Sequence, residues 1–116
     1  MNREPNLHLP LRPADFLLLA VLQDEPLHGY GLSKAMAERS DGCIAVRPGD
    51  MYRVLDRLVE QEIVTVDESS IDERGRTTYR LTKLGRRVLR AEAQRLSDLS
   101  ARVLAAATAE PREVSG

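Results

Sequence analysis

The sequence is poor in cysteine and aromatic residues and carries little net charge. Its 116 residues include one cysteine, Cys43, no tryptophan and two histidines, and the formal net charge is −1. A single cysteine excludes a disulfide within the chain. One cysteine and two histidines are also too few ligands for a metal sensor. We therefore expect no metal and no other cofactor, and an inert, partly buried thiol at Cys43. The net charge by itself gives no sign of nucleic-acid binding.

Long hydrophobic runs are also missing. The longest dense one, FLLLAVL at residues 16–22, is too short to cross a bilayer, and the first residues lack the apolar segment that a secretory signal needs. We expect a cytoplasmic protein without a membrane partner. The 42% hydrophobic and 30% charged content is typical of one soluble globular domain. A domain of this size buries a modest core, so it gains from a partner subunit.

Apolar spacing, proline and glycine predict three helices in the first half of the chain. Residues 16–22 are apolar nearly all round, which indicates a buried helix that begins near Pro13 and stops before Pro26. A second helix follows His28 and ends at Asp41 and Gly42. The third lies in the segment RPGDMYRVLDRL, residues 47–58, where one apolar stripe is formed by Met51, Val54, Leu55, Leu58 and Val59.

The second half predicts a hairpin and a long helix. Two β-prone runs, residues 63–66 and 77–81, flank a loop that contains glycine. Thr82 suits the N-cap of a helix from about residue 83 to about 107. The expected fold is mainly α with a small β-hairpin (α+β), a winged helix-turn-helix over residues 1–82, ordered from about residue 12. A C-terminal dimerisation helix over 83–108 and a disordered tail over 109–116 complete it.

The outward face of the third helix carries the residues that favour DNA binding. In a winged helix-turn-helix this helix enters the major groove, and Arg53 and Arg57, four residues apart, share one face there. Each arginine can bond guanine or clamp a phosphate, and the Tyr52 hydroxyl suits a phosphate. Pro48 and Gly49 would let the start of the helix approach DNA closely.

Basic residues also gather after the third helix. From residue 74 to residue 90 there are seven basic residues and no acidic one: Arg74, Arg76, Arg80, Lys83, Arg86, Arg87 and Arg90. Such a run is often only a solvated face. On a winged fold, however, Arg74 and Arg76 would lie at the wing tip, where we expect them to contact phosphates or the minor groove.

Three stretches resemble the PadR family of bacterial transcriptional regulators. They are LHGYGLSKAM (27–36), RPGDMYRVLDRLVEQEIV (47–64) and GRTTYRLTKLGRRVL (75–89), in the family's order. The resemblance implies a homodimeric repressor of the short type that responds to a small aromatic or phenolic effector. The complete set of expected DNA-binding residues is Tyr30, Lys34, Arg47, Pro48, Gly49, Tyr52, Arg53, Arg57, Arg74 and Arg76.

Two positions depart from the family pattern. Asp50 replaces the usual threonine or serine, and a carboxylate there either caps the helix or faces DNA. Glu62 replaces a common glycine, so we expect the turn from the third helix into the wing to be made differently. In short family members that bind drugs, an aromatic residue on the final helix stacks against the drug. This sequence has no tryptophan that could take that role. Tyr30 either contacts the DNA backbone or packs in the core.

The final helix carries an apolar seam suited to a homodimer. Leu89, Leu96 and Val103 recur every seven residues, with Leu99 and Ala106 between them. Glu92 interrupts this seam, so we expect Phe16 and Leu17 of the first helix to cover part of it across the dimer. In the alternative, the same leucines pack only within their own chain.

These features lead to one main hypothesis and one rival. The main one is a dimeric, sequence-specific repressor on a palindromic operator, which it leaves when a small molecule binds near the dimer interface. The rival is a winged-helix protein-interaction module whose arginines pair with an acidic partner. No triad, metal cluster or phosphate-binding glycine loop indicates an enzyme, and we expect His28 to be structural or near a phosphate rather than a catalytic base.

Overall fold

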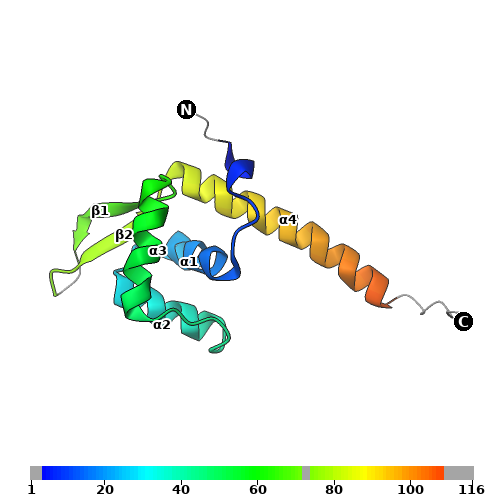
Figure 1. The fold of residues 1–116 in the computed structure, drawn as a ribbon, viewed down its shortest axis with the longest axis horizontal. Helices are drawn as coiled ribbons and strands as arrows, with labels where there is room; N and C mark the ends of the chain where they lie inside the picture. The colour runs from blue at the N-terminus through cyan, green and yellow to red at the C-terminus, as the bar shows by residue number, and fades with distance from the viewer. Residues whose placement is uncertain (1–3, 72–73, 109–116) are drawn as a thin grey trace, which may run out of the picture.

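The computed structural model describes residues 4–71 and 74–108, without the side chains of 68–71, so the expected tail at 109–116 lies outside the described residues. The chain forms η1 (Pro5–His8), α1 (Pro13–Asp24), α2 (Gly29–Arg39) and α3 (Pro48–Glu60), then β1 (Val64–Ile71), β2 (Thr77–Leu81) and α4 (Lys83–Thr108). This is the mainly helical fold with a small hairpin that the sequence predicts. Figure 1 shows α1, α2 and α3 gathered beside the hairpin, with α4 extending away from them.

The helix boundaries follow the signals in the sequence. Pro13 and Pro48 stand at the first positions of α1 and α3, where the missing proline N–H costs nothing. Thr82 caps α4, because its Oγ1 accepts the Gly85 N–H at 2.9 Å. The same hydroxyl donates to the carbonyl of Glu62 at 2.5 Å. Thr82 thus joins the end of α3 to the start of α4, as well as capping the helix.

The hairpin is longer on its first strand than the sequence predicts. β1 extends to Ile71 and pairs antiparallel with β2 in a register that sets Val64 opposite Leu81 and Val66 opposite Tyr79. The register shifts between Asp67 and Ile71. Leu27, just before α2, exchanges two backbone hydrogen bonds with Tyr79, of 3.1 Å and 2.8 Å. The wing is therefore fixed to the helical part by its second strand.

One hydrophobic core joins all the helices to the base of the wing. Leu19 of α1, Leu32 of α2, Leu55 of α3 and Val88 of α4 are fully buried within it. Gly85 allows α4 to begin close to the end of α3, because a Cβ on Gly85 would lie 2.1 Å from the carbonyl oxygen of Ile63. No side chain larger than hydrogen fits there without moving the backbone.

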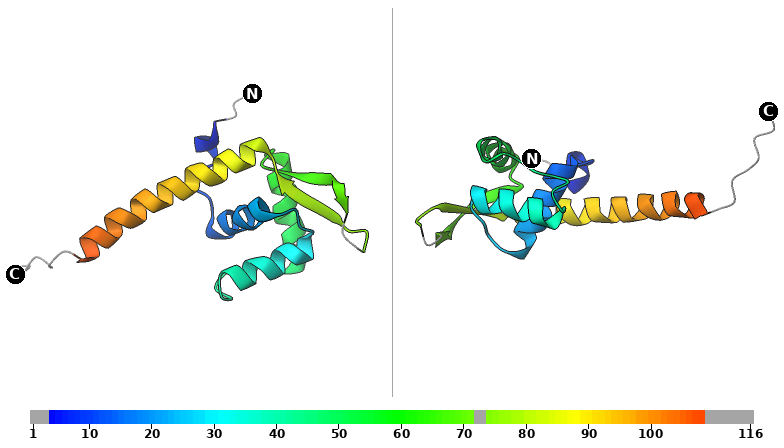
Figure 2. Two further views of the ribbon diagram at one scale, coloured as in Figure 1. Left: turned by 180° about the vertical axis from the view of Figure 1, so that it is seen from behind. Right: turned by 90° about the horizontal axis from the view of Figure 1, so that it is seen from below.

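Residues 4–12, before α1, form a defined N-terminal arm, although we expected order only from about residue 12. η1 lies beside α4, and Figure 2 shows it on that helix from behind. The arm is held by the Leu11 N–H, which donates to Oε2 of Glu92 at 2.7 Å. No local pattern indicates this contact, because the two residues are 81 positions apart.

Candidate nucleic-acid interface

The starts of α2 and α3 present an exposed polar surface. Tyr30 is 58% exposed and the Arg53 side chain 83% exposed. Other expected DNA-binding residues on these two helices are exposed as well: Lys34, Arg47, Pro48, Gly49 and Tyr52. The exposure of Tyr30 excludes the alternative that it packs in the core.

Tyr52 lies against the first turn of α2. A Cβ on Gly29 would lie 3.0 Å from Cζ of the Tyr52 ring and 3.2 Å from its hydroxyl oxygen. Glycine at this position thus lets α2 and α3 approach each other through the ring, while Tyr52 remains 49% exposed. The contact places the tyrosine hydroxyl at the start of both helices.

His28 caps α2. Its Nδ1 accepts the Gly31 N–H at 3.1 Å, and its ring stacks on Tyr30 with centroids 6.3 Å apart. The cap satisfies one of the N–H groups that a helix leaves unpaired at its start. His28 therefore has the structural role that was one of its two expected roles, and its ring also stacks on Tyr30.

Asp50 pairs with Arg53 instead of capping α3. Its Oδ1 accepts from Nη2 of Arg53 at 3.1 Å, whereas the N-cap residue Arg47 makes no side-chain hydrogen bond. Both side chains of the pair are more than half exposed, so the pair is weak and exchanges readily with solvent or another anion. Arg53 is the exposed cation of this helix, with Asp50 as its local counter-charge.

Arg57 is half-buried and ion-paired, although it lines one surface hollow together with Arg53, so its contact with DNA stays a prediction. Arg57 is held by the start of α1. Its Nη2 donates to both carboxylate oxygens of Asp15, at 3.0 Å each, across 42 positions of sequence. Asp15 is 5% exposed, and a carboxylate so far from water requires a cation. Arg57 therefore joins α3 to α1, and its side chain is only 39% exposed.

The basic run is divided between the wing and α4. At the wing tip Arg74 is exposed and Arg76 half-buried. On β2, Nε of Arg80 lies 4.0 Å from the carboxylate of the buried Asp67. The other four basic residues lie exposed on the first turns of α4, and they are Lys83, Arg86, Arg87 and Arg90.

The turn between α3 and β1 has a left-handed residue. Glu62 has a φ of 62°, in the region that glycine adopts without cost. Glu62 is therefore strained there, and whether the turn differs from that of the family stays a prediction. By contrast, Cys43 is exposed and not partly buried as expected, because the segment after α2 lies at the surface.

Glu92 is a buried carboxylate whose partners the sequence analysis missed. It is 1% exposed and accepts from Nε of Arg95 at 2.5 Å in addition to the Leu11 N–H. The hydrogen bond from Arg95 holds the pKa of Glu92 below its ordinary value, although burial opposes this shift. The sequence shows Glu92 only as an interruption of the apolar seam on the final helix, and nothing in it identifies the partners of the carboxylate.

The expected dimer seam is divided between the core and the surface. Leu89 is 6% exposed and packs in the core of its own chain, so it is not a surface residue of the seam. Leu96, Phe16 and Leu17 are half-buried. Leu99 and Val103 are 46% and 58% exposed, and Leu104, which the seven-residue spacing missed, is 63% exposed.

This arrangement of helices, wing and exposed α3 defines the winged helix-turn-helix class. Over residues 18–91 the chain matches the Transcriptional regulator PadR-like family. The protein belongs to this family of regulators, which are not enzymes. Among the described residues, no helix is long and apolar enough to cross a membrane, and no cluster of candidate metal ligands occurs.

Curated relatives and solved structures agree with this assignment. An uncharacterized 37.1 kDa protein in transposon Tn4556 of Streptomyces fradiae is 37% identical over 103 residues, or 88% of this chain and 28% of that protein. Transcriptional regulator Rv3488 of Mycobacterium tuberculosis is 30% identical over 70% of this chain and 73% of its own. The chain covers only 42% of transcriptional regulator YqjI of Escherichia coli, at 30% identity over 77% of this chain.

Two solved structures share the fold. A PadR-like transcriptional regulator of Bacillus cereus has a TM-score of 0.71 at 21% identity, over 83% of this chain and 92% of that one. PadR of Bacillus subtilis in complex with operator DNA has a TM-score of 0.59 at 20% identity, over 71% of this chain and 46% of that one.

Proposed function

We propose that the protein is a homodimeric, sequence-specific repressor that binds a palindromic operator in the cytoplasm and leaves it when a small effector binds. The observation that carries the proposal is the exposed surface at the starts of α2 and α3. There Tyr30, Tyr52 and the highly exposed Arg53 stand together on two helices that Gly29 brings into contact. Family membership and the operator complex of Bacillus subtilis PadR support the same function.

Each residue of this surface has a distinct proposed task. Arg53 reads a base edge or clamps a phosphate once its weak pair with Asp50 opens. Tyr30, Lys34 and Tyr52, with the start of α3 at Arg47, Pro48 and Gly49, hold the phosphate backbone. Arg74 and Arg76 extend the contact from the wing. Arg57 acts indirectly, by setting the position of α3 through Asp15.

The dimer is proposed from the exposed end of α4. From residue 97 to residue 108 this helix is exposed throughout, and it projects from the domain in Figure 1. A short stretch of helix without tertiary packing is marginal in water. Leu99, Val103 and Leu104 therefore suit burial against a second copy, with Phe16 and Leu17 as the contribution of α1.

A retardation assay on the DNA upstream of the protein's own gene tests the proposal. The native protein should shift this DNA and not a scrambled duplex. In a plot of log affinity against log salt concentration, the slope should be about −0.9 for each phosphate that the protein neutralises. Binding to neither duplex would favour the rival, an interaction module for an acidic protein.

The dimer has its own test. Leu99→Asp with Val103→Asp alters residues that are exposed in the single chain, so the fold should persist while dimers dissociate. Sedimentation should show one chain mass, and operator binding should fall steeply because the second half-site contact is lost. A variant that still sediments at twice the chain mass would contradict this interface.

A further inference from the structure

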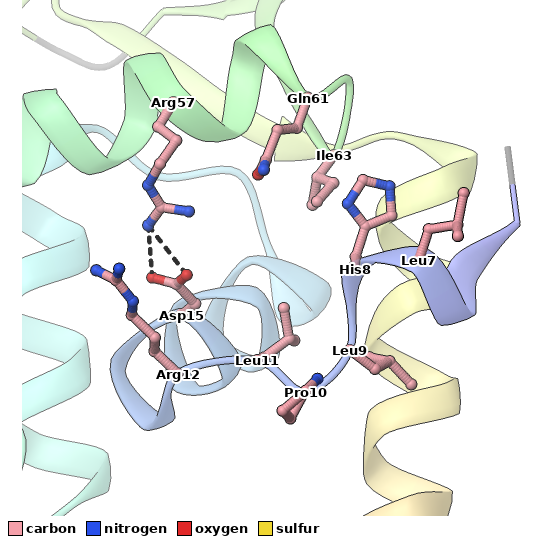
Figure 3. Close-up of a pocket in the computed structure, with 10 residues that line it drawn as sticks. All are labelled: Leu7, His8, Leu9, Pro10, Leu11, Arg12, Asp15, Arg57, Gln61 and Ile63. Carbon is pink, nitrogen blue, oxygen red and sulfur yellow. Dashed lines mark hydrogen bonds and ion pairs between the residues drawn. The ribbon is translucent and has the colours of Figure 1, made fainter. Parts of the chain in front are cut away.

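A pocket of about 270 Å³ lies between the N-terminal arm, the start of α1 and the end of α3. Figure 3 shows Arg57 of α3 and Gln61, just after the end of α3, reaching into it from one side, with His8 on the arm and Leu11 and Asp15 opposite. The pocket lies within one chain and away from the exposed apolar end of α4.

Positive groups predominate in the lining. Arg12 and Arg57 face one carboxylate, Asp15, which is 5% exposed and receives two hydrogen bonds from Arg57. Those bonds use only Nη2 of Arg57, and its other terminal nitrogen, Nη1, lies on the side of Gln61 and His8 in Figure 3. The Arg12 side chain makes no cap hydrogen bond to α1, and the free N–H groups of the first turn add positive potential there.

The pocket lies between α3, which carries the proposed DNA-binding residues, and the arm, which is bonded to α4. Arg57 belongs to the helix that carries Arg53, and Gln61 is the C-cap residue of the same helix. The arm is tied to α4, the proposed dimerisation helix, by the bond from Leu11 to Glu92. A molecule bound between arm and α3 therefore connects the DNA-reading helix to the helix that spaces the two subunits.

We propose that this pocket binds a small organic anion, a carboxylate or a phosphate ester, and that its occupation is the effector signal. The anion is held by Arg12 and Nη1 of Arg57, with the Gln61 amide and the His8 ring as further hydrogen-bonding groups. The regulatory part of this inference rests on the proposed repressor function. An effector acts only if it binds one arrangement of α3 more tightly than the other, so the anion should favour the arrangement with weaker operator binding.

Nuclear magnetic resonance of the native protein, titrated with benzoate at constant ionic strength, tests the site without DNA. Benzoate should shift the backbone amides of Leu11, Arg12 and Gln61 in a saturable way, and the neutral benzamide should not. Inorganic phosphate in a separate titration shows whether the anionic group alone is sufficient, and shifts at the same amides would also support the site. Absence of these shifts with both anions, or equal shifts with benzamide, would overturn the proposal.

Arg12→Gln tests the charge without breaking the pair of Asp15 with Arg57. Loss of one charge-assisted hydrogen bond should weaken benzoate or phosphate binding about tenfold or more. Arg39→Gln, an exposed arginine at the far end of α2, is the matched control and should bind as the native protein does. Equal affinity of the Arg12→Gln variant and the control would overturn the assignment.

The two proposals fail separately. If the native protein binds no operator without any anion while the pocket amides still shift, the repressor function fails and the anion site stands. If operator binding is specific and salt-dependent but benzoate and phosphate leave both the pocket amides and operator affinity unchanged, the anion site fails and the repressor function stands.

Discussion

The ion pair between Asp15 and Arg57 gives the sharpest test of how α3 is positioned. Removing Arg57 leaves a carboxylate that is 5% exposed without its two hydrogen bonds. Loss of one partner of a fully buried pair costs about 3–5 kcal/mol. Arg57 is 39% exposed, so water replaces part of the interaction, and we expect about 2 kcal/mol for Arg57→Gln. That is a substantial part of the roughly 5–15 kcal/mol by which such domains are stable.

A double-mutant cycle with urea unfolding measures the interaction. Asp15→Asn and Arg57→Gln should each destabilise, and the double variant should lose about 1–2 kcal/mol less than the sum of the two. Operator affinity of the double variant then separates the two roles of Arg57. Near-native affinity supports positioning, whereas a loss of about 1–3 kcal/mol with the fold intact indicates a base contact. Stability effects that add to within about 0.5 kcal/mol would refute the reasoning.

Three other predictions follow from the structure. Gly85→Ala should lower the stability by about 3 kcal/mol, because its Cβ would lie 2.1 Å from the Ile63 carbonyl oxygen, and an unchanged Tm would contradict that contact. Glu62→Gly should raise the stability by up to about 1 kcal/mol in urea unfolding through relief of the left-handed backbone, and a loss would show that the Glu62 side chain matters more. Because the hydrogen bond from Arg95 holds the folded-state pKa of Glu92 below its ordinary value, the contribution of Glu92 should be complete above that ordinary value and decline as the pH falls through the folded pKa. Glu92→Gln should therefore be less stable than the native protein near neutrality, with the gap closing in acid, and a constant gap would argue against the linkage.

Local signals in the sequence were sufficient for the elements of the fold. Pro13 and Pro48 mark the starts of α1 and α3, and Thr82 marks the start of α4. Each of these residues acts on the backbone within a few positions of itself. The exposed surface at α2 and α3 could also be predicted from local sequence, because helical spacing separates core positions from surface positions.

The interactions that were missed join residues distant in sequence. Arg57 stands at the edge of the apolar stripe, and its partner Asp15 is 42 positions away, so spacing alone could not show which way it turns. The arm lacks helical periodicity, and its anchor Glu92 is 81 positions from Leu11. At Glu62 the chain has a left-handed backbone that its residue type disfavours, and the carbonyl of Glu62 is held by Thr82, 20 positions away.

Operator binding by Arg53→Ala, measured by fluorescence anisotropy over a series of salt concentrations, tests the central claim most directly. Arg53 is the most exposed cation described on α3, and Arg39→Ala, at the far end of α2 with an exposed pair to Asp24, is its matched control. We expect Arg53→Ala to lose about 1–3 kcal/mol of binding free energy, with a smaller salt slope if the contact is to a phosphate, and the control to behave as the native protein. Native affinity and salt slope for the Arg53→Ala protein would contradict the assignment of this surface to DNA.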